Sequence, residues 1–270
     1  MGNVPQPLHV RHFGHGPRKV LALHCTLAHS GAWRGLAAEL AEEVTLTAPD
    51  MLSHGRSPDW DGQGDIQDRT LAAVLPLMEG RMDVMGHSFG GTVALRMAVE
   101  HPERVRSLIL IEPVLFAVAA QDAPEIRARH DEEARPFAEA HARGDRELAA
   151  RLFNRMWGGG VGPRWPDLPE QTRAAMIRAI DYVPASHGAV MEDRPGLLKP
   201  GVLDRVRVPV LLLRGSASHP VIEVVNDGLA RRLPEARSEV VEGAGHMLPI
   251  SNPREVAERV RAFLRAVPEA

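Results

Sequence analysis

The sequence is poor in several features that mark particular classes of protein. Cys25 is the only cysteine among 270 residues, so an intrachain disulfide is impossible. No stretch approaches the roughly 18 apolar residues of a membrane span. The formal net charge of −3 gives no basic excess that would favour a nucleic-acid partner. The first residues lack the charged and apolar regions of a secretory signal. We therefore expect a cytoplasmic protein without a membrane span.

Aromatic residues are also scarce, with six Phe, four Trp and one Tyr. Apolar residues nevertheless make up 44% of the chain, which is enough for the core of one large domain.

Short apolar runs alternate with helical patterns at both ends of the chain. The predicted strands are 19–23, 44–47, 82–85, 105–111, 208–213 and 238–241. The predicted helices are 33–43, 65–78, 91–99 and a last one that begins at Pro253. Asn252 is expected to cap this last helix, with Glu255 completing a capping box. Alternation of this kind is typical of βαβ units and a parallel sheet, which places the protein in the α/β class.

The middle of the chain has a different pattern. No strand is predicted between residues 114 and 200, and the helical candidates there are 124–134, 145–157 and 169–182. Pro136 is expected to end the first of these helices, because proline has no backbone N–H to donate. The predicted organisation is a core domain formed by 1–113 and 201–270, interrupted by a helical insertion at 114–200.

Ser88 stands in the run Gly86-His87-Ser88-Phe89-Gly90, between a predicted strand and a predicted helix. A sharp turn from strand to helix needs small neighbours, since a Cβ there would clash. It places the hydroxyl at a helix N-terminus, where peptide dipoles favour developing negative charge. This is the nucleophile-elbow pattern G-x-S-x-G in its required context. A tight turn with an incidental serine is the alternative.

With Ser88 in this context, the chain resembles the α/β-hydrolase superfamily, and four further segments match. They are Leu-His-Cys-Thr at 23–26, Ala-Pro-Asp with His-Gly-Arg-Ser at 48–57, Val-Pro-Val-Leu-Leu-Leu-Arg-Gly at 208–215, and Gly-Ala-Gly-His at 243–246. The resemblance implies a mostly parallel central sheet flanked by helices. It also implies that the insertion is a cap, or lid, over the active site.

The same resemblance assigns the catalytic base to His246, in the loop after the last predicted strand. In much of the family an Asp stands about three residues beyond the glycine that here is Gly215, but no carboxylate follows it closely. Some members carry the acid at the end of the strand after the nucleophile helix, and Glu112 occupies that place. Glu112 is therefore the expected acid, with Glu223 and Asp227 as alternatives.

The oxyanion hole would take one backbone N–H from Phe89, the residue after the nucleophile, and another from Thr26. Cys25 departs from the family pattern, which has glycine at that position, and a Cβ there constrains the loop. A serine nucleophile forms an acyl-enzyme, so the substrate should offer a carbonyl carbon. A serine at this position excludes the reactions with alkyl halides and epoxides for which other members of the superfamily use an aspartate nucleophile.

The expected function is hydrolysis of a small to medium apolar ester, thioester or lactone. A C–C-bond hydrolase, an acyltransferase and a slow-turnover ligand receptor are the alternatives. No cofactor, metal or nucleic acid is expected, and the partner is a small acyl substrate. Substrate identity stays open, as does the choice between monomer and homodimer. Aromatic residues of the insertion are candidates for the pocket wall: Phe116, Phe153, Trp157, Trp165 and Tyr182.

Overall fold

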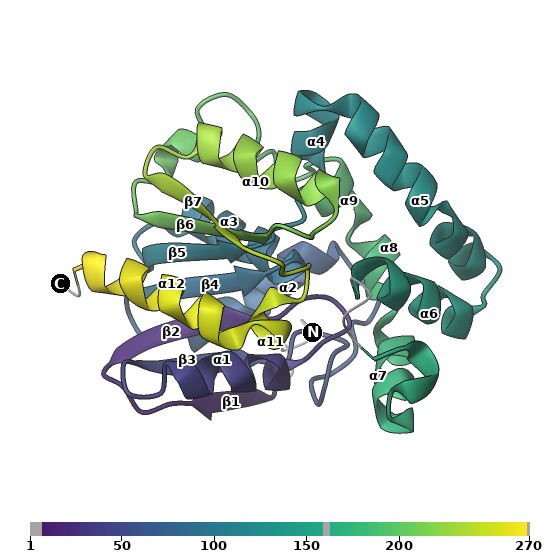
Figure 1. Ribbon diagram of the computed structural model, residues 1–270, viewed down its shortest axis with the longest axis horizontal. Coiled ribbons are helices and arrows are strands. Elements are labelled where there is room, and N and C mark those ends of the chain that lie inside the picture. Colours follow the sequence, from purple (N-terminus) through teal and green to yellow (C-terminus); the bar gives the residue numbers. More distant parts are fainter. Residues whose placement is uncertain (1–6, 159–162, 269–270) are drawn as a thin grey trace.

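The computed structural model describes residues 7–158 and 163–268, and its centre is a seven-stranded sheet (Figure 1). The strand order is β1-β3-β2-β4-β5-β6-β7, and only the edge strand β1 runs antiparallel to its neighbour. The strands are β1 (Val10–Phe13), β2 (Arg18–Leu23), β3 (Val44–Pro49), β4 (Met82–His87), β5 (Val105–Ile111), β6 (Val210–Gly215) and β7 (Ala236–Val241). All six predicted strands are present, with ends shifted by a residue or two, and the predicted α/β class is confirmed.

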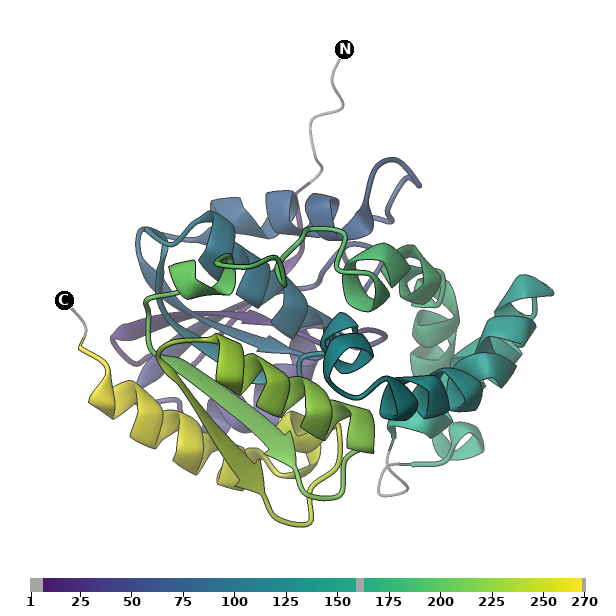
Figure 2. The same ribbon diagram turned by 90° about the horizontal axis from the view of Figure 1, so that it is seen from above.

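Helices cover both faces of the sheet, which explains why β4 and β5 are buried almost throughout. One face packs against α1 (Arg34–Glu39) and α12 (Pro253–Ala266), with the short α11 (Leu248–Ser251) beside them. The other face packs against α2 (Ile66–Val74), α3 (Phe89–Glu100) and α10 (Pro220–Arg232). Figure 2 shows the sheet between these two layers.

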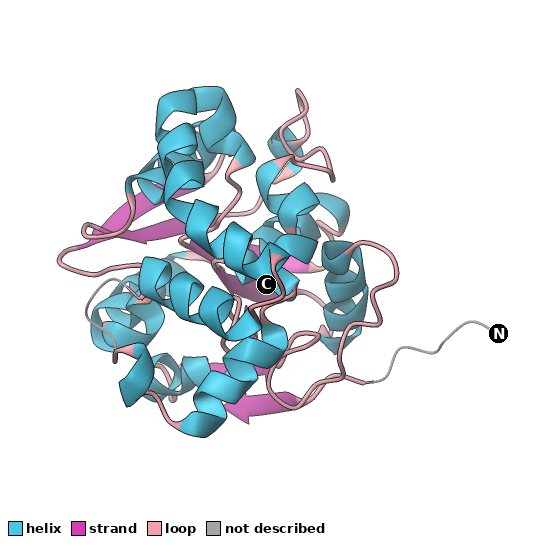
Figure 3. Ribbon diagram, turned by 90° about the vertical axis from the view of Figure 1, so that its right-hand side faces the viewer, coloured by secondary structure: helices cyan, strands magenta, loops and turns pink. Residues whose placement is uncertain are grey.

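Residues 114–200 form helices between β5 and β6, and no strand is present among the described residues of this segment. These helices are α4 (Ala117–Asp122), α5 (Pro124–Ala142), α6 (Arg146–Trp157), α7 (Glu170–Ala179), α8 (Tyr182–Ala185) and α9 (His187–Met191). They gather at one end of the sheet, and Figure 3 looks onto that end. Part of the segment has a small core of its own, which includes Ala149, Trp165 and Ile180.

Two local predictions were wrong. Pro136 does not end a helix, because α5 continues through it to Ala142. Proline removes one backbone hydrogen bond there, but the helix is held on both sides of it by packing against α6 and by ion pairs from Arg135 to Glu132 and Glu139. Asn252 does not cap α12 with its side chain, because its Oδ1 accepts a hydrogen bond from Ser251 Oγ instead.

A buried ion cluster lies where the parallel strands begin, at the end of the sheet away from Ser88. The Asp83 carboxylate accepts two hydrogen bonds from Arg18, at 2.6 and 2.9 Å, and one from Ser107 at 2.6 Å. Arg18 Nη1 also donates to the carbonyl oxygens of Leu264 and Val267 at the end of α12. The cluster thereby ties the last helix to the centre of the sheet.

Candidate active site

Ser88 occupies a strained turn between β4 and α3. Its backbone has φ 56° and ψ −120°, a conformation that L-residues rarely adopt. The turn is possible because the residues two positions away on either side lack side chains: a Cβ on Gly86 would lie 2.3 Å from Gly90 O, and one on Gly90 would lie 2.3 Å from Leu23 O. Ser88 N donates to Ile111 O at 2.9 Å, which fixes the turn against β5. The side chain is thus held at the N-terminus of α3.

Glu112 and His246 form a hydrogen-bonded pair beside this turn. His246 Nδ1 lies 2.7 Å from Glu112 Oε2, and both side chains are buried. Because a carboxylate can only accept, Nδ1 carries the proton and Nε2 keeps a lone pair for another donor. A base held in one tautomer by a carboxylate is the arrangement that activates a serine hydroxyl.

The second oxygen of Glu112 is also occupied. Gly215 N donates to Oε1 at 2.6 Å, and Ser218 Oγ makes a short hydrogen bond to the same atom. Ser218 thus occupies the position, three residues beyond Gly215, at which much of the family has an aspartate. The alternative acids lie on α10, where the Glu223 side chain is 55% exposed and pairs with Arg214. Asp227 belongs to the same helix, whereas the carboxylate that contacts His246 is that of Glu112.

His87 fills the variable position of the turn and supports the histidine loop. Its Nε2 donates to His246 O at 2.8 Å. Burial, together with the neighbouring His246, holds the pKa of His87 well below its usual range. The neutral ring can therefore serve as a fixed support without adding a charge next to the base.

Two more neutral histidines hold the loop that contains Thr26. His24 Nδ1 bonds Cys25 O at 2.8 Å, and its Nε2 accepts from Met51 N at 2.9 Å. His54 Nδ1 bonds Leu52 O at 2.8 Å, and its Nε2 accepts from Leu27 N at 3.0 Å. Burial lowers the pKa of His24 to about 4 and that of His54 to about 3.

These contacts matter because Leu27 has a positive φ of 63°, an unusual backbone conformation for leucine. His54 holds Leu27 in this conformation, immediately after Thr26. Cys25 is buried, and burial raises the pKa of its thiol to about 12, so it stays an inert thiol.

Asp50 is the structural carboxylate of the neighbouring loop. It is buried, which favours the neutral form, but backbone N–H groups of Ser30 and Arg56 donate to it at 2.7 and 2.9 Å and lower its pKa to about 2. A Cβ on Gly55, which has φ 52°, would lie 2.2 Å from this carboxylate. The loop at 50–57 is therefore built around Asp50, and His54 is part of that scaffold.

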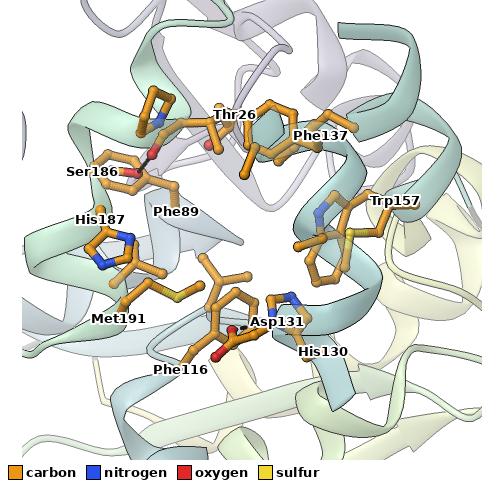
Figure 4. Close-up of a pocket in the computed structure, with 18 of the residues that line it drawn as sticks. Thr26, Phe89, Phe116, His130, Asp131, Phe137, Trp157, Ser186, His187 and Met191 are labelled. Atoms are coloured by element: carbon orange, nitrogen blue, oxygen red, sulfur yellow. Dashed lines mark hydrogen bonds and ion pairs between the residues drawn. The ribbon is translucent and has the colours of Figure 1, made fainter. Parts of the chain in front are cut away.

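A pocket of about 370 Å³ lies between the Ser88 turn and the helical segment (Figure 4). Ser88, Phe89 and Thr26 line it from the sheet side. The other walls come from α5, α6, α8, α9 and the segment after β5, and they are mostly apolar: Val114, Phe116, Ala134, Phe137, Ala138, Phe153, Met156, Trp157, Val183, Pro184, Val190 and Met191. Such a pocket suits a substrate with an apolar chain.

Three of the five aromatic residues suggested for the pocket wall line it, namely Phe116, Phe153 and Trp157. The other two pack elsewhere. Trp165 belongs to the small core of the helical segment, and Tyr182 is buried with its hydroxyl 2.6 Å from Thr70 Oγ1. Both are large apolar residues of the insertion, so nothing in the sequence separated them from the true lining.

His246 is not itself among the lining residues, because the Trp157 ring lies over it at 4.6 Å between centroids. Sequence analysis missed the contribution of α5 to the pocket. The signal was helical periodicity, since the lining residues of α5 recur along one face of the helix, including Arg127, His130, Ala134, Ala138 and His141.

The described residues hold no group of three or more His, Cys, Asp or Glu side chains placed to bind a metal ion. Nor does any helix within the described ranges have the length and apolarity needed to cross a membrane.

The parallel sheet, the serine on the strained turn and the adjoining carboxylate–imidazole pair define the α/β-hydrolase class of enzymes. The sequence profile of the alpha/beta hydrolase family matches residues 20–259, so the chain belongs to this family and is a hydrolytic enzyme.

Individual relatives match over nearly the whole chain. Lipase LipV of Mycobacterium tuberculosis is 30% identical, with 95% of this chain and 97% of that protein covered. The pimeloyl-(acyl-carrier protein) methyl ester esterase of Nitrosomonas europaea is 28% identical, with 92% and 96% covered. Among solved structures, an alpha/beta hydrolase from Sphaerobacter thermophilus superimposes with a TM-score of 0.71 at 25% identity, covering 97% of this chain and 99% of that one.

Proposed function

We propose that the protein is a serine esterase in which Ser88 is the nucleophile, His246 the base and Glu112 the acid. The observation that carries the proposal is the 2.7 Å Glu112–His246 pair beside a serine held in a strained turn under an apolar pocket. The names of the relatives, a lipase and a methyl ester esterase, support an ester as substrate.

In the proposed reaction, Ser88 Oγ attacks the ester carbonyl carbon while its proton passes to His246 Nε2. The oxygen of the tetrahedral intermediate accepts hydrogen bonds from the N–H groups of Phe89 and Thr26. Collapse breaks the bond to the alcohol, which takes the proton from His246 and leaves an acyl-Ser88. Water then attacks the acyl carbon by the same proton transfers in reverse and releases the acid.

The helical segment 114–200 fits the role of the cap in this scheme. Its side chains supply most of the apolar walls above Ser88, and Trp157 covers the His246 ring. Such a cover excludes water from the base and strengthens electrostatic interactions around it. We therefore assign the core domain to 1–113 and 201–270.

Hydrolysis of short nitrophenyl esters tests the proposal. Ser88→Ala should lower kcat/KM by at least about 10³-fold, because the covalent step is lost. Glu112→Gln should lower it on the order of 10²- to 10⁴-fold, because the base loses its orienting carboxylate. Glu223→Gln is the matched control and should stay within about twofold of wild type, since exposed charge changes of this kind have small effects.

Unchanged turnover in Ser88→Ala would overturn the scheme, and a loss confined to Glu223→Gln would move the acid to α10. Rapid reaction with a vinylogous diketone or an alcohol acceptor, with poor ester hydrolysis, would favour a C–C hydrolase or an acyltransferase. Ligand-induced stabilisation with negligible turnover would favour a receptor.

A further inference from the structure

One ring nitrogen of His130, in the wall of the pocket, lacks a partner in the part of the chain that the structure describes. His130 lies on α5, is only 3% exposed and lines the same pocket as Ser88. Its Nε2 is buried and has no hydrogen-bond partner within residues 7–158 and 163–268. Nearly all buried polar atoms in proteins have a partner, so an orphan in a pocket wall points to one that arrives with a ligand.

The protonation of the ring follows from its other nitrogen. His130 Nδ1 faces Asp131 Oδ1 at 3.4 Å, and a carboxylate can only accept. We therefore place the proton on Nδ1, which leaves a lone pair on Nε2. Burial lowers the pKa of His130, so the ring is neutral. Nε2 is thus a hydrogen-bond acceptor, and its partner must be a donor such as O–H or N–H.

Ring contacts hold the imidazole in place. His130 packs against Phe116 at 4.5 Å and Trp157 at 5.8 Å between centroids, and it meets His219 edge to face at 5.4 Å. In Figure 4 it lies between Phe116 and Trp157, across the pocket from Phe89. Trp157 also contacts His246, so the same indole touches the His130 ring and the proposed base.

The charged residues around the pocket are already neutralised. Arg127 Nε donates to Asp131 at 2.9 and 3.0 Å, and Arg135 pairs with Glu132 and Glu139. Because these charges are paired, the site offers an ionised substrate little electrostatic stabilisation. The apolar walls and the unpaired His130 Nε2 instead favour a neutral substrate.

We propose that His130 Nε2 is the acceptor of a substrate subsite, and that the enzyme prefers uncharged esters with a hydroxyl or amide N–H group on an otherwise apolar chain. This assignment rests on the proposed esterase function and narrows its substrate class. An ester without the donor leaves the acceptor unpaired, and a site built to pair with a polar group discriminates against such analogues.

The test compares methyl esters of straight-chain hydroxyalkanoic acids, with the hydroxyl at successive positions, against isosteres in which methyl replaces hydroxyl. The readout is the ratio of kcat/KM values for each pair within one protein. We expect a ratio of roughly ten or more for at least one hydroxyl position in wild type, and a ratio of about one in His130→Phe. His141→Phe is the matched control. His141 also lines the pocket, but its Nε2 already lies 3.0 Å from Asp181, so the ratio should persist.

A wild-type ratio near one at every position would overturn the subsite, as would a ratio that survives in His130→Phe. The wild-type ratio needs no variant, so the test holds even if His130→Phe fails to fold. If Ser88→Ala abolishes hydrolysis but every wild-type kcat/KM ratio is close to one, the esterase function is supported and the subsite is overturned.

If no ester of the panel is hydrolysed, the esterase function fails, and calorimetry then decides on the subsite. Titrating the same ester pairs into Ser88→Ala protein should show tighter binding of the hydroxy ester by a similar factor. Equal Kd values for both members of each pair would overturn the subsite.

Discussion

At the scale of single residues, the feature that most shapes the proposed chemistry is the environment of Glu112. The carboxylate is fully buried, and its backbone has a positive φ of 47°. One oxygen faces His246 and the other accepts from Gly215 N and Ser218 Oγ. Such donors stabilise the ionised carboxylate and fix its plane, so Ser218 acts as a positioning residue for the pair.

Ser218→Ala tests this role. Losing one of the two donors to Oε1 should loosen the orientation of the carboxylate and so of the imidazole. We expect kcat to fall about three- to tenfold with KM little changed. Steady-state kinetics measures both constants. A rise in KM with kcat unchanged would instead mean that Ser218 does not position the catalytic pair.

Sequence patterns identified those site residues whose role depends on neighbours that are close along the chain. Glu112 could be singled out because it is the acidic residue that ends an apolar strand, and Ser88 because glycines flank it. His130 could not be found in this way. Its relevance depends on Phe116, Trp157 and His219, which lie far along the chain and meet only in the folded protein.

At the scale of elements, the close approach of α3 to β2 depends on glycine. Gly90→Ala would place a Cβ 2.3 Å from Leu23 O, and backbone cannot yield as a flexible side chain can. We expect a loss of roughly 3 kcal/mol or more in the free energy of unfolding, measured by urea denaturation.

Gly35→Ala is the control for this substitution. Gly35 lies within α1, and an added Cβ would meet only Pro253 at 3.4 Å. The change should be neutral or stabilising by up to about 1 kcal/mol, because alanine favours the helix. Equal losses in the two variants would mean that the packing of α3 against β2 is not what excludes a side chain.

Element boundaries were harder to predict than the elements themselves. The strands could be predicted because most residues of a strand that is buried on both faces are apolar, as in β5 and β6. The sequence reading missed β1 and α10. The strand β1 is a four-residue edge strand with partly exposed side chains. The continuation of α5 past Pro136 depends on its packing against α6, and the helix propensities of individual residues do not take such packing into account.

At the scale of the whole molecule, buried neutral histidines couple stability to pH. His24 and His54 have pKa values of about 4 and about 3 in the folded protein, below the ordinary 6.5. The unfolded chain therefore binds more protons below pH 6.5, and stability must fall as the pH drops from about 6.5 towards 4. His87 contributes with the same sign.

We expect the free energy of unfolding to be lower at pH 5 than at pH 7 by roughly 3 kcal/mol, from urea denaturation at each pH. The His54→Gln variant cannot titrate at this position and should show a shallower dependence. A flat profile between pH 7 and 5 would mean that these rings take up protons without disturbing the fold.

Trp157 joins two parts of the site that are usually treated separately. Its indole is a wall of the pocket and also the ring that lies over His246. The fit of the acyl chain and the proton-accepting step therefore share one side chain. An acyl chain that contacts the indole alters the surroundings of the imidazole. The length of the acyl chain should therefore affect the rate of bond cleavage as well as the affinity for the substrate. A change at Trp157 that alters selectivity for the acyl chain should then also alter kcat.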